Sequence, residues 1–213
     1  AFYCFSKAAN MKGKEALTEL GLALMHGGIF VGKRAQLVQV KGCQQPNDPH
    51  EFLTHFQQAA LLGDDLANNY LGAYYYSRGE KQKGVRYFKE GCLSQNCARA
   101  LCNLGICYEE GVAGEAEQDL DRAVSLYEQS AKMEFLPAMV RLADLLLKLG
   151  KREKSLKGRQ VEAEECYQEC QNWLRMALVI DQDCGEACYL LGCLFLEGLS
   201  LDQNYELAFQ YFT

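Results

Sequence analysis

The chain has 213 residues, a formal net charge of −6 and 49% hydrophobic residues, so it can bury a core and is too apolar for a disordered segment. Only 3 prolines and 15 Val, Ile and Thr residues are present, which argues against a sandwich, a barrel or a parallel sheet and favours an all-α protein. The acidic balance argues against nucleic-acid binding. Because no run of about 18 apolar residues occurs, we expect no membrane insertion.

One sequence pattern recurs along the chain, most clearly as Ala100, Leu104-Gly105, Tyr108 and Gly111. The spacing i, i+4, i+8 places its apolar residues on one face of a helix. A glycine inside a helix costs about 1 kcal/mol relative to alanine, so its recurrence predicts a neighbouring helix packed closely against it. The closing glycine is typical of a helix C-terminus. The marker position recurs at Gly21, Gly72, Gly105, Ala143 and Gly192, and the closing glycines are Gly27, Gly79, Gly111, Gly150 and Gly198.

A second pattern follows each copy of the first, as in Gly84, Tyr87-Phe88 and Gly91-Cys92. It has a small residue, then two large apolar residues, then two more small residues, again at helical spacing. The predicted unit is therefore a helix A, a loop and a helix B. Short links between the units predict that successive helices are antiparallel neighbours.

These patterns resemble the Sel-one-like repeat (SLR) family, a relative of the tetratricopeptide repeats. Residues 100–111 match the first half of the family pattern and residues 1–13 match the second half. The resemblance covers nearly the whole chain and implies an all-α superhelix, or solenoid, of antiparallel helix pairs. Because both ends fall inside a helix B without polar capping repeats, we expect a fragment of a longer protein. The expected single array (1–213) comprises a partial repeat 1–13, repeat 14–63 with a loop insertion 28–50, repeats 64–95 and 96–134, repeat 135–182 with a loop insertion 151–160, and a partial repeat 183–213.

The 11 cysteines are the first candidates for chemistry. Two spaced pairs, Cys166 with Cys170 and Cys184 with Cys188, resemble the twin pattern that staples a helical hairpin. The turn near Asp181, however, leaves Cys170 about 15 Å from the start of the next helix, and disulfide partners need Cα atoms within about 7 Å. We therefore predict mostly free thiols in a reducing compartment such as the cytoplasm, and a redox or metal-binding protein remains an alternative.

Motifs for metal binding and catalysis are weak. Cys43, Asp48, His50 and His55 lie close in sequence and could bind zinc, but their spacing matches no standard pattern. No phosphate-binding loop, nucleophile elbow or His-Glu-x-x-His motif is present in the sequence. We therefore predict no cofactor and no enzymatic activity for this chain, while a docking arm for a catalytic domain outside it remains the alternative.

The family resemblance implies a scaffold or adaptor that mediates protein–protein interaction, with a peptide or helix of the partner on the concave wall lined by the A helices. The wall combines apolar anchors with an excess of acidic residues, so the expected partner carries basic residues beside apolar ones. Wall positions carried over from the tetratricopeptide fold predict the partner-binding residues Leu22, Met25, Asn69, Tyr76, Ile106, Glu109, Glu110, Asp144, Leu147, Lys148 and Tyr189.

Overall fold

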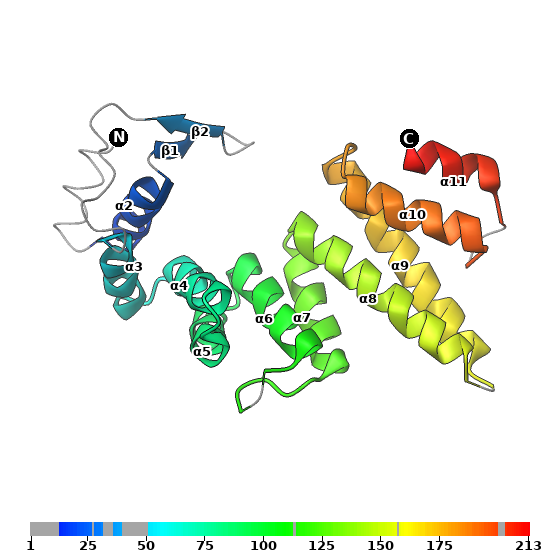
Figure 1. The fold of residues 1–213 in the computed structure, drawn as a ribbon, viewed down its shortest axis with the longest axis horizontal. Helices are drawn as coiled ribbons and strands as arrows, with labels where there is room; N and C mark the ends of the chain where they lie inside the picture. Colours follow the sequence, from blue (N-terminus) through cyan, green and yellow to red (C-terminus); the bar gives the residue numbers. More distant parts are fainter. Residues whose placement is uncertain are drawn as a thin grey trace. The chain divides into compact units, whose positions relative to one another are not determined.

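The computed structural model is helical throughout except for one pair of short strands, over the residues that it describes. These are residues 13–26, 28–31, 36–39, 51–112, 114–156, 158–199 and 203–213. The chain divides into two compact units, Ala1–Gln118 and Asp119–Thr213, and each unit is described by itself. Both are built from antiparallel helix pairs, which confirms the all-α solenoid of repeats (Figure 1).

Over its described residues, the first unit contains two helix pairs and the A helix of a third. α2 packs on α3 and α4 packs on α5, while α3 contacts α4 and α5 contacts α6. The contacts between consecutive pairs close a core around Phe56 and Leu71, which are 1% and 0% exposed. The elements are α2 (Lys14–His26), β1 (Gly28–Val31), β2 (Gln36–Gln39), α3 (Glu51–Leu61), α4 (Asp65–Ser77), α5 (Lys81–Gly91) and α6 (Ala98–Glu110).

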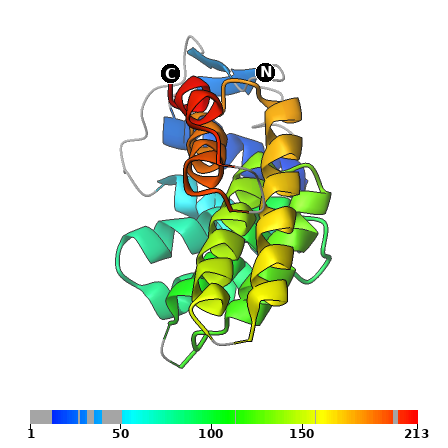
Figure 2. The ribbon, with the colours of Figure 1, turned by 90° about the vertical axis from the view of Figure 1, so that its right-hand side faces the viewer.

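The second unit begins with a B helix and continues with two helix pairs. α8 and α9 are the longest helices described and lie side by side as an antiparallel pair (Figure 2). Their core includes Leu142, Tyr167 and Leu174, each at most 2% exposed. The elements are α7 (Leu120–Lys132), α8 (Leu136–Lys154), α9 (Gln160–Ile180), α10 (Gly185–Glu197) and α11 (Tyr205–Phe212).

The marker glycines Gly21, Gly72 and Gly192 lie where helices A and B pack closely, as the sequence predicted. A Cβ atom at Gly72 would lie 2.5 Å from the Phe88 ring, and one at Gly21 would lie 2.7 Å from the Phe56 ring. At Gly192 a Cβ would likewise overlap a ring, that of Phe212. The glycine therefore leaves the space that the aromatic residue of helix B fills, which explains why the two patterns recur together.

Three of the predicted closing glycines act as helix ends. Gly79, Gly111 and Gly198 have φ of 86°, 77° and 62°, and each follows an A helix. The prediction is wrong at Gly150, which lies inside α8, where a Cβ would come 2.5 Å from the Tyr167 ring. Gly150 thus provides a close approach between the two lengthened helices α8 and α9. Gly27 lies outside the described residues.

Parts of the two predicted loop insertions form regular structure. Within 28–50, β1 and β2 pair antiparallel, with Ile29 opposite Val38 and Phe30 opposite Leu37. Such β-branched and apolar pairs favour strands, a signal that the loop-like composition of the segment concealed. Within 151–160, α8 continues through Lys154, so the link to α9 is shorter than predicted.

Candidate functional site

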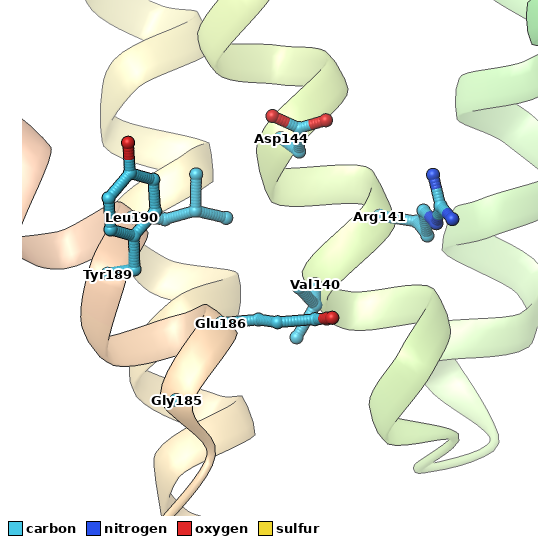
Figure 3. A pocket seen from close by; sticks show the side chains of 7 residues that line it. All are labelled: Val140, Arg141, Asp144, Gly185, Glu186, Tyr189 and Leu190. Atoms are coloured by element: carbon cyan, nitrogen blue, oxygen red, sulfur yellow. The ribbon is translucent and has the colours of Figure 1, made fainter.

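A groove of about 430 Å³ lies between the A helices α8 and α10 of the second unit (Figure 3). Its floor is formed by Val140 and Leu190, which are only 6% and 8% exposed. The Tyr189 side chain, which is 61% exposed, stands beside this floor. A Cβ at Gly185 would meet nothing within 4 Å, so one wall of the groove is open. The lining residues are Val140, Arg141, Asp144, Gly185, Glu186, Tyr189 and Leu190.

Contacts within the last helix pair, α10 and α11, hold the Tyr189 side chain in place. Its ring packs against Phe212 of α11, with 5.9 Å between the centroids. A hydrogen bond with Cys193 raises the pKa of the Tyr189 hydroxyl, so the side chain is neutral at physiological pH. The Tyr189 ring is therefore held in position and is still largely exposed to solvent. An aromatic ring with these two properties can serve as an anchor for a ligand side chain.

The charges along the groove fall into two classes. On α8, the Lys148 Nζ atom lies 2.7 Å from the Asp144 carboxylate. Between the helices, Lys151 Nζ lies 2.8 Å from Glu197 Oε1. Over the part of the chain that the structure describes, the remaining charged residues of the groove, Arg141 and Glu186, form no ion pair, and both are exposed. These two charges are consequently available to a ligand.

The corresponding A helices of the first unit, α4 and α6, present a different surface. The Tyr76 hydroxyl donates to Glu110 Oε2 at 2.7 Å, and Lys81 Nζ lies 3.3 Å from the same oxygen. Burial, followed by this hydrogen bond, raises the pKa of Tyr76. The Asn103 side-chain amide donates to Asn69 Oδ1 at 2.7 Å. The polar groups on this face are therefore engaged within the unit.

The predicted wall residues occupy several environments. Leu22, Asn69 and Leu147 are 8%, 4% and 6% exposed, so we omit them from the candidate docking surface. The Met25 side chain lies outside the described residues. The groove contains two predicted residues, Asp144 and Tyr189. Elsewhere, Tyr76, Ile106 and Glu109 are half-buried, and Glu110 and Lys148 are exposed.

Sequence reasoning missed Arg141, Glu186 and Leu190. The first two lie three residues before Asp144 and Tyr189, respectively, and residues spaced i, i+3 share a helix face. The wall residues were predicted at fixed offsets from the marker position. On α10 these offsets begin at Tyr189 and so leave out the preceding turn, which contains Glu186. Applying the i, i+3 relation to each wall residue would have found both charges.

The cysteines described by the structure are buried or half-buried and form no disulfides with one another. Burial raises the pKa of Cys107 and of Cys170 to about 12 in each case. A thiol with such a pKa is protonated at neutral pH and is a poor nucleophile or metal ligand. Among the described residues no group of His, Cys, Asp and Glu could hold a metal ion. Of the candidate zinc set, Cys43, Asp48 and His50 lie outside those residues.

Across the described segments, no helix combines the length and the apolar character needed to cross a membrane.

Comparisons with known proteins agree with the repeat architecture. No curated protein matches the sequence. The structure resembles c5321, a protective antigen of uropathogenic Escherichia coli strains with an SLR fold, at a TM-score of 0.73 and 20% identity, covering 99% of this chain and 39% of that one. It also resembles a Sel1 repeat protein from Oxalobacter formigenes at a TM-score of 0.68 and 22% identity, covering 99% of this chain and 75% of that one. The chain thus spans well under half the length of c5321.

The family itself is identified from the sequence. The sequence profile of the Sel1 repeat matches residues 1–12, 65–96, 98–135 and 185–213, together more than half of the chain. These segments include α4 to α7 and α10 to α11. The matched segments and the paired-helix architecture agree, and the chain belongs to the Sel1 repeat family.

Proposed function

We propose that the chain is a protein-interaction scaffold that binds a segment of a partner protein in the α8–α10 groove. The observation that carries this proposal is an exposed aromatic residue beside a buried apolar floor, between consecutive A helices. Binding sites commonly combine an apolar floor with a few polar groups that fix the orientation of the ligand. Family membership favours this binding role over an enzymatic one.

The expected ligand has an apolar anchor with a basic residue near it. The floor formed by Val140 and Leu190 accepts an aliphatic or aromatic side chain, which the Tyr189 ring would partly cover. The carboxylate of Glu186, which has no ion-pair partner among the described residues, favours a neighbouring lysine or arginine by charge complementarity. This expectation is consistent with the basic and apolar partner that the sequence predicted.

The test is a selection of random 12-residue displayed peptides against the wild-type chain, followed by measurement of the affinities of the enriched peptides by fluorescence anisotropy. Gly185→Trp adds a large side chain where the groove is open, so it should weaken binding at least tenfold while the circular dichroism stays unchanged. Glu165→Trp on α9 adds the same side chain at an exposed position outside the groove and should leave the affinity unchanged. Equal affinities for the two variants would contradict the groove as the binding site.

We also propose that the protein works in a reducing compartment such as the cytoplasm. The free thiols among the described cysteines support this assignment. Thiol titration of the unfolded, unreduced protein should find at least eight of the 11 cysteines reactive. Four or more disulfides would contradict the proposal.

A further inference from the structure

We infer that the occupant of the α8–α10 groove carries both a basic and an acidic residue close to an apolar one. This inference rests on the proposed function and adds to it the acidic half of the ligand. The proposed function needs only an anchor and a cation, which Tyr189 and Glu186 would meet. The additional element comes from Arg141, which lines the same groove.

Some of the charges along the groove are already neutralised by neighbouring side chains, and others are open. Asp144 has its cation in Lys148, at 2.7 Å, and Glu197 has its cation in Lys151, at 2.8 Å. A ligand cation at either carboxylate would have to compete with a lysine already in place. The open charges of the groove are therefore one carboxylate and one guanidinium, and not an acidic surface.

The two open charges, Glu186 and Arg141, come from different helices of the groove. Figure 3 shows Glu186 extending from α10 toward Val140 on α8, whereas Arg141 projects from α8 away from α10. The open charges thus belong to different helices, and the Glu186 side chain ends beside Val140 whereas Arg141 lies on the side of α8 away from α10. A segment that crosses from α10 to α8 meets Val140 and the end of the Glu186 side chain together, and then Arg141.

An occupant whose only charged residues are basic would match the groove poorly. Such a segment would place a cation, or no charge at all, beside the Arg141 guanidinium, and like charges at an interface oppose binding. An acidic residue at that position could instead form the two parallel hydrogen bonds that a guanidinium offers to a carboxylate. A ligand of mixed charge is consequently the best match for the groove as it stands.

The probes are five synthetic 12-residue peptides of otherwise identical sequence, in which a leucine has a variable flanking residue two positions away on each side. Alternate residues of an extended chain point the same way, so this spacing presents all three side chains to one surface. The flanking residues are lysine and glutamate, lysine twice, glutamate twice, or glutamine twice. The peptide with lysine and glutamate is made in both orders, because a bound segment can run across the groove in either direction.

Anisotropy with the full chain should show that one mixed peptide binds about threefold to tenfold more tightly than the double-lysine peptide, at low salt. Arg141→Glu should reverse this preference in favour of double lysine, and Glu186→Lys should favour double glutamate. The variant with both substitutions should prefer the mixed peptide in the opposite order. Circular dichroism confirms folding, which these exposed helix positions should preserve.

The outcomes separate this inference from the proposed function. If the double-lysine peptide binds the wild type as tightly as either mixed peptide and Arg141→Glu changes nothing, the inference is overturned while the groove remains a binding site. If the peptides bind equally to the wild type and to Gly185→Trp, or none binds and the selection enriches none, the proposed function is overturned together with the inference.

Discussion

The A-helix faces of the two units share one repeat pattern but leave different groups available. On the face formed by α4 and α6, Tyr76 is hydrogen-bonded to Glu110, which also pairs with Lys81. On the face formed by α8 and α10, Tyr189 is 61% exposed beside an open groove. The repeat pattern therefore determines which helix face a residue lies on. The neighbouring side chains determine whether that residue is engaged within the unit or available to a ligand.

The difference between filled and open space can be tested directly on two glycines. In Gly72→Leu the new side chain meets the Phe88 ring and the Gly84 carbonyl oxygen, at 2.5 and 3.1 Å from the Cβ position. Overpacking of this kind should lower the free energy of unfolding by about 1–3 kcal/mol or more. In Gly185→Leu the Cβ meets nothing within 4 Å, so the change should stay within about 0.5 kcal/mol. Urea unfolding of both variants would measure this, and equal losses would contradict the close approach at the marker position.

The available and the engaged tyrosine should differ in their contribution to ligand binding. Tyr189→Ala removes the exposed anchor of the groove, and loss of such an anchor costs about 2 kcal/mol, or roughly 30-fold in affinity. The matched control is Tyr205→Ala, because Tyr205 is similarly exposed, at 65%, and does not line the groove. Anisotropy with a selected peptide should show a loss for Tyr189→Ala alone. A comparable loss for Tyr76→Ala, with the fold intact, would mean that the face of the first unit also binds.

Each unit also contains a fully buried thiol, Cys107 in the first and Cys170 in the second. Burial raises both pKa values from 9.0 to about 12, so the folded state keeps a proton that the unfolded state loses. The stabilisation is complete below about pH 9 and is lost progressively as the pH rises toward 12. Between pH 8 and pH 10 each thiol should cost about 1 kcal/mol of stability. Urea unfolding of Cys107→Ala and Cys170→Ala should show a correspondingly weaker dependence on pH, and an unchanged dependence would contradict their burial.

The repeat architecture was predictable because close helix packing depends on glycines that the sequence shows directly. Gly72 and Gly192 are recognisable by their position in an apolar helix pattern, and each faces an aromatic residue of the next helix. Gly150 was wrongly predicted to end its helix. In sequence, a glycine at a helix end and a glycine packed under an aromatic ring look alike, and only the length of α8 distinguishes them. The groove was only partly predictable, since Asp144 and Tyr189 follow from the repeat register but the open charge of Arg141 depends on which lysines reach which carboxylates.

The smallest expected effect isolates the hydroxyl groups of the two tyrosines. Tyr76→Phe removes the donor to Glu110 but keeps the ring, which lies 5.0 Å from Lys81 Nζ. A hydrogen bond to a charged group in a half-buried site contributes about 1 kcal/mol, so the free energy of unfolding should fall by about that amount. Tyr189→Phe removes the hydrogen bond with Cys193 but keeps the contact with Phe212, and it should change stability by less than about 0.5 kcal/mol because the bond joins a neutral thiol to a largely exposed side chain. Chemical unfolding of the two variants at low and high salt provides the measurement. Equal losses would mean that Tyr76 is no more engaged than Tyr189, and the distinction between the engaged face of α4 and α6 and the open groove of α8 and α10 would then be wrong.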